Sequence, residues 1–178
     1  MNICVFCSAS GTLPPEYYEA ARSLGRWIAL NRHTLVFGGC RMGLMEAVAS
    51  AARVAGGRTI GVVPRIVEEG GRESDNVDTR ILCESLDDRK AIMVQRSDVF
   101  VALPGGIGTL DEVFTVLASA SIGYHAKRVV LYNVGGFWDS LLAMLGDLRG
   151  RGVIRPGFDD TMCVADTMEQ LCQCLSCV

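Results

Sequence analysis

The chain has 178 residues, which corresponds to a single domain of ordinary size. Hydrophobic residues make up 49% and charged residues 21%, as in typical soluble proteins, and the net charge of −3 offers no basic field for nucleic acid. The apolar runs fall far short of the about 20 residues that a bilayer span needs, and the first residues lack the pattern of an export signal. We therefore expect one cytoplasmic domain over residues 1–178, with neither nucleic acid nor a membrane as partner.

Short apolar, β-branched runs alternate with helically spaced apolar residues along the chain. We expect strands over residues 3–7, 34–37, 59–63, 79–83, 98–103, 128–132 and 161–164. We expect helices over residues 14–31, 44–54, 86–96, 110–120, 137–148 and 168–175. Residues 65–78 are polar and contain glycine, which predicts a loop with at most one helical turn.

This alternation predicts an α/β fold, a Rossmann-like doubly wound and mostly parallel sheet with helices on both faces. In such sheets ligands bind beyond the carboxyl ends of the strands, near the point where the strand order reverses. Three loops that follow predicted strands are rich in small residues, namely residues 8–11, 38–43 and 105–109. If they face one crevice, they favour a nucleotide or a sugar phosphate as ligand.

The loop over residues 103–112 carries the strongest signal, because a proline and three glycines separate a predicted strand from a predicted helix. Glycines let a ligand approach the backbone, and the amides at a helix start suit phosphate. The loop is neither a Walker A sequence nor a G-x-G-x-x-G motif. Two interpretations of Glu112 remain open: a functional carboxylate, or the partner of Thr109 in a capping box.

A second candidate lies at the start of the preceding predicted helix, in the sequence Leu-Asp-Asp-Arg-Lys over residues 86–90. Two cations in a first helical turn oppose the helix dipole, which Asp87 and Asp88 partly offset. A solvated helix start explains this segment without any function. Alternatively, Arg89 grips an anion, since guanidinium suits phosphate and carboxylate groups.

The eight cysteines are expected to be reduced thiols, because no export signal is present. Cys4 and Cys7 differ by three positions, so along a strand they point to opposite faces and make a poor redox pair. The Cys-x-Cys-x-x-Cys sequence over residues 172–177 could bind a metal but lacks a second ligand cluster. We expect no metal site.

These motifs together resemble the LOG ("Lonely Guy") family, which has also been labelled as lysine decarboxylases. The family's Pro-Gly-Gly-x-Gly-Thr-x-x-Glu signature is present over residues 104–112, and its Arg-Lys segment is matched over residues 86–90. Further likeness at residues 5–10, 36–45, 60–64 and 131–137 extends over nearly the whole chain. The resemblance implies hydrolysis of the N-glycosidic bond of cytokinin riboside 5′-monophosphates or AMP.

Carried over by position, Arg89 and Glu112 are the implied catalytic pair, with Glu112 acting at ribose C1′ and Arg89 holding it ionised and oriented. The implied substrate-binding residues are Ser8, Gly38, Gly39, Lys90, Gly105, Gly106, Ile107, Gly108 and Thr109. The resemblance implies no cofactor, a small nucleotide as substrate and a homodimer, for which Tyr124, His125 and the helix from Leu110 suit a partner face.

The chain departs from the family at four places. Asp87 and Asp88 precede Arg-Lys, Glu46 follows Gly-Leu-Met, residues 118–121 lack the usual Trp and Gln, and Glu73 is only a loose match to a family Glu. These departures put the preferred base in doubt and are expected to add negative charge near the site. Two other functions remain open: a molybdenum-cofactor-type carrier, and a decarboxylase, which would need a cofactor-binding lysine.

Overall fold

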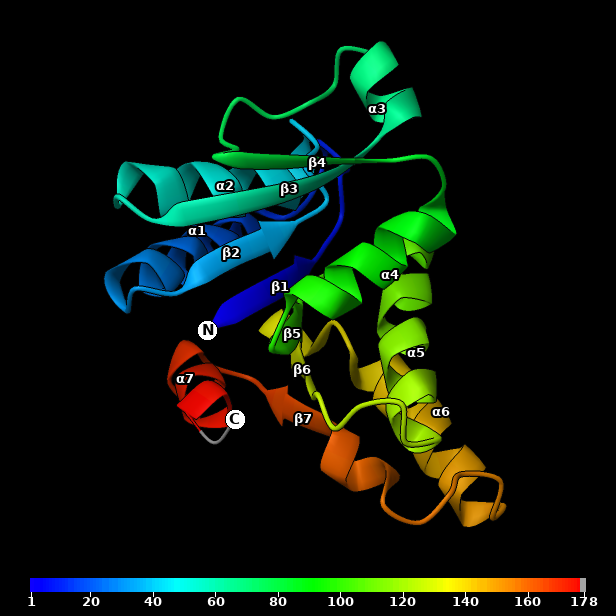
Figure 1. Ribbon diagram of the computed structural model, residues 1–178. Helices are drawn as coiled ribbons and strands as arrows, with labels where there is room; N and C mark the ends of the chain where they lie inside the picture. Colours follow the sequence, from blue (N-terminus) through cyan, green and yellow to red (C-terminus); the bar gives the residue numbers. More distant parts are fainter. Residues whose placement is uncertain (177–178) are drawn as a thin grey trace.

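The computed structural model describes residues 1–176 and contains a seven-stranded sheet flanked by helices (Figure 1). The strands are β1 (Asn2–Phe6), β2 (Thr34–Phe37), β3 (Arg58–Pro64), β4 (Thr79–Cys83), β5 (Val99–Ala102), β6 (Val129–Tyr132) and β7 (Met162–Ala165). The α-helices are α1 (Pro15–Leu30), α2 (Gly43–Val54), α3 (Arg65–Glu69), α4 (Leu86–Arg96), α5 (Ile107–Ser121), α6 (Asp139–Gly150) and α7 (Met168–Ser176).

The strand order is β4-β3-β2-β1-β5-β6-β7, and neighbouring strands are parallel throughout. From the central β1 the chain first builds one half of the sheet through β4, and then returns to β5 on the other side of β1. The strand order therefore reverses between β1 and β5, where a doubly wound sheet places its ligand. The expected α/β, Rossmann-like fold is confirmed.

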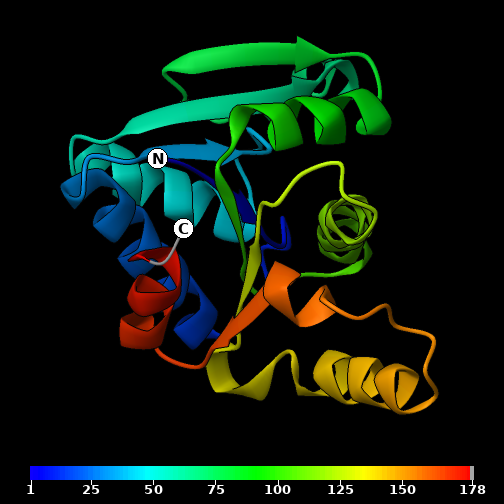
Figure 2. The ribbon, with the colours of Figure 1, turned by 60° about the horizontal axis from the view of Figure 1, so that its bottom comes forward.

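Helices cover both faces of the sheet because the buried strands carry apolar residues on both sides. Ile3 and Val5 of β1 pack with α1, α2 and α7, whereas Cys4 and Phe6 pack with α4 and α5 on the other face. Figure 2 shows α1, α2 and α7 on one side of the sheet and α4, α5 and α6 on the other. Cys7 joins the cluster opposite to Cys4, as their spacing predicts.

Helix α5 begins three residues earlier than expected, and this overturns one interpretation of Glu112. The residue at its N-cap is Gly106, which supplies no side-chain hydrogen bond. Thr109 is consequently the third residue of the helix, and Glu112 lies in its second turn. The capping-box interpretation is therefore wrong, because Thr109 is not at the N-cap position that such a box requires.

The other elements lie within a few residues of the expected positions, and α3 is the single helical turn expected within residues 65–78. Over the described part of the chain, no helix combines the length and apolar character of a membrane span. The expectation of reduced thiols is wrong for one pair, since a disulfide joins Cys163 on β7 to Cys174 on α7. Their proximity arises because α7 folds back against the edge of the sheet; Cys177 lies outside the described residues.

Candidate functional site

The loops after β1 and β5 meet the start of α2 where the strand order reverses. The Ser8 amide donates a hydrogen bond of 3.1 Å to the Pro104 carbonyl, and the Ser8 carbonyl accepts one of 2.9 Å from the Leu44 amide. Gly43 permits this arrangement, because its φ is +58° and a Cβ there would lie only 2.5 Å from the Ser10 carbonyl oxygen. Ser8 thus ties three segments distant in sequence into one edge of the sheet.

A hollow of about 260 Å³ opens between these segments. It is lined by Cys7, Ser8, Ala9, Met45, Arg89, Gly106, Gly108, Thr109 and Glu112. The loops after β1 and β5 contribute directly, as their composition predicts. The loop after β2 does not line the hollow, which reaches that part of the chain only at Met45 of α2.

The first turn of α5 forms one wall of the hollow and is open to an anion. Its N-cap, Gly106, supplies no side-chain cap, and a Cβ at Gly106 or Gly108 would meet no atom within 4 Å. Amides in this position carry the positive end of the helix dipole and suit a phosphate group. Ile107 is 83% exposed and does not line the hollow, so its contribution to this turn is its backbone amide.

A glycine is needed at position 105 because the Thr109 side chain occupies the space that a larger residue would fill. A Cβ at Gly105 would lie 2.1 Å from Thr109 Oγ1. Without that atom, the buried Thr109 folds back over the loop and lines the hollow. The two residues therefore shape the anion-binding turn together.

Arg89 of α4 and Glu112 of α5 meet inside the same hollow. Arg89 Nη1 lies 3.7 Å from Glu112 Oε1, and the two side chains are 13% and 7% exposed. The Nε atom of Arg89 is buried and has no hydrogen-bond partner. The pair is therefore close enough for charge attraction but retains hydrogen-bonding capacity for a ligand.

Burial raises the pKa of Glu112 from its ordinary 4.5 to about 7. The positive charge of Arg89 opposes this rise, while Asp111 adds to it and Lys90 slightly opposes it. A carboxyl group that titrates near neutral pH can take up and release a proton during a reaction. Because both side chains are largely withdrawn from water, this chemistry is confined to the hollow.

The structure gathers some of the residues singled out from the sequence and leaves others outside. Arg89, Glu112, Ser8, Gly106, Gly108 and Thr109 share the hollow. Lys90, by contrast, does not line it: its ammonium group lies 2.9 Å from an Asp111 oxygen and 3.2 Å from Asp87. Gly38 and Gly39 also lie outside the lining, with Gly38 against the Arg89 guanidinium and Gly39 against Val63.

Sequence reasoning missed Cys7, Ala9 and Met45 as site residues. Cys7 and Ala9 flank Ser8 after β1, and Met45 lies in the first turn of α2, so their positions next to small-residue loops were the available signal. Burial holds the pKa of the Cys7 thiol well above its usual value, and the nearby Glu112 charge adds to this effect. Cys7 is therefore a neutral, compact wall of the hollow.

The additional carboxylates do not charge the hollow as expected. Glu46 accepts hydrogen bonds from Ser74 and Asn76 and holds that loop against α2. Ser85 caps α4 by accepting a hydrogen bond from the Asp88 amide, and the Asp88 carboxylate accepts one of 3.1 Å from the Glu84 amide just before the helix. Asp87 is exposed and paired with Lys90.

Glu73, the loose match to a family carboxylate, also lies outside the hollow. Its carboxylate pairs with Arg80 at 3.1 Å, and its backbone forms an antiparallel bridge with Cys40. These contacts use Glu73 to fasten the 72–76 segment to the loop after β2.

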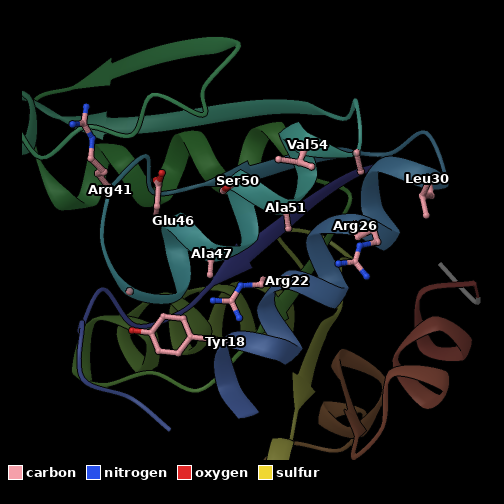
Figure 3. A pocket seen from close by; sticks show the side chains of 12 residues that line it. Tyr18, Arg22, Arg26, Leu30, Arg41, Glu46, Ala47, Ser50, Ala51 and Val54 are labelled. Carbon is pink, nitrogen blue, oxygen red and sulfur yellow. The ribbon is translucent and has the colours of Figure 1, made fainter. Parts of the chain in front are cut away.

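A larger cavity lies elsewhere on the molecule. It measures about 710 Å³ and lies between α1 and α2, with Arg22, Arg26 and Ala47 among its lining residues (Figure 3). Neither Arg89 nor Glu112 lines it. It therefore lacks the carboxylate–guanidinium pair of the smaller hollow and is not the candidate active site.

The positions of the two lysines argue against decarboxylase chemistry in the hollow. Lys90 is held by Asp111 and Asp87, and Lys127 Nζ donates to the Val94 carbonyl at 2.7 Å. Neither ammonium group lines the hollow.

Within residues 1–176, no three His, Cys, Asp or Glu side chains are grouped so that they could hold a metal ion.

Comparisons with known proteins find relatives that match most of the chain. A family model described as "Possible lysine decarboxylase" matches residues 45–175. The chain is 44% identical over 155 residues to an Oryza sativa protein named "Probable cytokinin riboside 5′-monophosphate phosphoribohydrolase", covering 87% of this chain and 68% of that protein. It is 38% identical over 168 residues to a Mycobacterium tuberculosis protein named cytokinin riboside 5′-monophosphate phosphoribohydrolase, covering 94% and 89%.

Among solved structures, the molybdenum cofactor binding protein of Rippkaea orientalis superposes with a TM-score of 0.76 at 28% identity, covering 99% of this chain and 95% of that one. Solved structures with this fold thus include a protein that binds the molybdenum cofactor. The family model and the sequence relatives, which span most of the chain, decide membership: this chain belongs to the LOG family, whose model carries the lysine decarboxylase description.

Proposed function

We propose that this protein hydrolyses the N-glycosidic bond of a nucleoside 5′-monophosphate, either a cytokinin riboside 5′-monophosphate or AMP, to the free base and ribose 5-phosphate. The observation that carries this proposal is the buried Arg89–Glu112 pair beside the uncapped start of α5. The two features together offer one place for a phosphate and another for acid–base chemistry. The names of the sequence relatives support the same reaction.

In the proposed reaction the 5′-phosphate lies at the amides of residues 107–109, and C1′ of the ribose lies beside Glu112. Ionised Glu112 either takes a proton from the attacking water or stabilises the positive charge that develops on the sugar, as carboxylates do in glycoside hydrolysis. The oxygen of water bonds to C1′ while the C1′–N bond breaks. The electron pair of the broken bond stays on the nitrogen of the departing base. The departing base takes up the proton that water releases.

A carrier without hydrolase activity is the competing function, because the structural neighbours include the molybdenum cofactor binding protein. A carrier needs a site for an anion but has no need of a carboxyl group whose pKa burial raises to about 7. The Arg89–Glu112 pair is the feature that favours a hydrolase.

We also propose that residues 1–178 act as one nucleotide-binding domain, in the cytoplasm and as a homodimer. A second hollow of about 440 Å³ lies between α4 and α5, next to Lys90, and includes Tyr124 and His125. Tyr124 is 80% exposed and Ile122 53% exposed, so this surface offers apolar area to a partner copy. The same two helices carry Arg89 and Glu112, which would place the active site close to the interface.

The proposal is tested by incubating the purified protein with AMP and with a cytokinin riboside 5′-monophosphate. Chromatography should detect free base and ribose 5-phosphate in equal amounts. The Glu112→Gln variant serves as the negative control, and Glu19→Gln, an exposed Glu on α1, as the matched control. If the wild-type protein binds a nucleotide but releases no base, the carrier function replaces the hydrolase.

A further inference from the structure

Gly38 follows β2 directly and contacts the guanidinium group of Arg89. A Cβ at position 38 would lie 1.6 Å from Arg89 Nη2 and 2.8 Å from Arg89 Cζ. It would also lie 3.2 Å from Sδ of Met45, which lines the hollow. No side chain larger than a hydrogen atom fits at position 38 while Arg89 keeps its place.

Backbone conformation does not explain a glycine at this position. The next residue, Gly39, has a φ of +69°, in the left-handed region that favours glycine. Gly38 is not among the residues with positive φ, so alanine can adopt its backbone conformation. The requirement at position 38 is therefore one of space, and the group that needs the space is the end of the Arg89 side chain.

We propose that Gly38 is a positioning residue, whose missing side chain forms the seat that holds the Arg89 guanidinium beside Glu112. That this seat affects catalysis rests on the proposed function. That Gly38 makes room for the Arg89 guanidinium rests on the distances alone. Two neighbouring glycines thus have different tasks: Gly39 turns the chain, and Gly38 makes room for a side chain from another helix. The guanidinium group is the far end of the flexible Arg89 side chain. Alanine at position 38 should therefore displace this group without disturbing the sheet.

The seat controls the charge that Glu112 experiences. The titratable groups that act with Glu112 are Arg89 and Lys90 on α4, Asp111 on α5, and two thiols, those of Cys4 on β1 and of Cys7 directly after it. Burial keeps both thiols neutral by raising their pKa values, and Lys90 is already tied to Asp111. Arg89 is therefore the cation that most strongly favours ionised Glu112.

Titration of the Glu112 carboxyl group in the Gly38→Ala variant tests the proposal without requiring turnover. The protein is labelled with ¹³C-glutamate, and the Glu112 signal is identified by its absence from the Glu112→Gln variant. A nearby opposite charge lowers a carboxyl pKa by about one unit or more, so displacement of Arg89 should raise the Glu112 pKa by about that amount. The rising limb of the pH–rate profile should move to higher pH by the same interval.

Gly70→Ala is the matched control. A Cβ at Gly70 would lie 3.1 Å from Arg72 Nε, so this variant also presses on an arginine side chain, and the negative φ of Gly70 suits alanine. Neither Gly70 nor Arg72 lines the hollow. This variant should leave the Glu112 titration unchanged. A pKa shift of equal size in both variants would overturn the proposal, because it would reflect general loosening.

The double variant Gly38→Ala/Arg89→Ala separates the seat from other effects. If Gly38 acts through Arg89, the double variant should show the same Glu112 titration as Arg89→Ala alone. It should also fold even if Gly38→Ala does not, because the colliding guanidinium is gone. A further shift in the double variant, or its failure to fold while Arg89→Ala folds, would refute the seat.

The outcomes distinguish this proposal from the proposed function. If the protein releases no base from any nucleotide but the Glu112 pKa shifts in Gly38→Ala, the positioning role of Gly38 stands and the hydrolase function is refuted. If the protein hydrolyses nucleotides but the Glu112 pKa is unchanged in Gly38→Ala, the hydrolase function stands and the positioning role of Gly38 is refuted.

Discussion

Replacing Glu112 by Gln should separate catalysis from stability, because the carboxylate lowers the stability of the fold when it is ionised. Burial raises its pKa from 4.5 to about 7, so the folded state holds a proton that the unfolded state releases in this interval. Stability should therefore fall as pH rises from 4.5 to 7 and level off above. At 1.36 kcal/mol per pKa unit, this loss is about 3 kcal/mol.

Gln is neutral at every pH and close in shape, so the variant should lose this pH dependence. In a chain of this size about 1 kcal/mol corresponds to 2–4 °C in Tm. About 2.5 kcal/mol of the loss falls between pH 5 and pH 8, so over this range the Tm of the unmodified protein should drop by roughly 5–10 °C more than that of the variant. Base release should fall by about 10²–10⁴-fold, the usual scale for losing a positioned acid or base.

The assay combines thermal unfolding at pH 5 and pH 8 with measurement of base release from AMP at pH 8. Glu19→Gln, on the exposed surface of α1, should retain both the wild-type Tm profile and the wild-type rate. Two results would refute the reasoning. If the Gln variant is active, Glu112 does not take part in the reaction. If the Tm of the Gln variant depends on pH as strongly as that of the unmodified protein, the pKa of Glu112 is not raised.

The remaining predictions concern the other parts of the site. Arg89→Ala should abolish base release and raise the Glu112 pKa above about 7; a variant with unaltered turnover would exclude Arg89 from the reaction. A crystal soaked with AMP or sulfate should show the anion at residues 105–109, and density for the phosphate elsewhere with this loop empty would defeat the assignment. Light scattering should return a dimer, which Tyr124→Glu should weaken; a 19.2 kDa species at micromolar concentration would overturn the dimer.

Local sequence pattern was sufficient for the elements of this fold. The β-branched run before Pro104 and the glycines after it predict a strand, a turn and a helix from the conformational preferences of the residues themselves. The same pattern predicts the start of the helix three residues late, since α5 begins at Ile107 and not at Leu110. That difference was enough to make the capping-box interpretation of Glu112 wrong, because the position of a residue relative to the helix start decides whether it can cap.

The site itself depends on contacts between distant segments. Arg89 and Lys90 are neighbours on α4, and the sequence favoured both as ligand contacts. About 100° of rotation separates adjacent residues on a helix, so packing of α4 against α5 turns Arg89 into the hollow and leaves Lys90 beside Asp111. The sequence likewise placed Glu46 near the site, whereas the fold directs it to Ser74 and Asn76.

By itself, the sequence determined the order of strands and helices, the glycine-rich turn and the residue types available for chemistry, because each follows from local spacing and backbone preference. Tertiary structure alone decided that Arg89 and Glu112 meet 3.7 Å apart and that Gly38 makes room for their contact. It also decided that burial shifts the Glu112 pKa to about 7. The physical reason is that distance, space and exclusion of water at this site are set by helices and strands that are remote in sequence and are brought together only when the sheet packs.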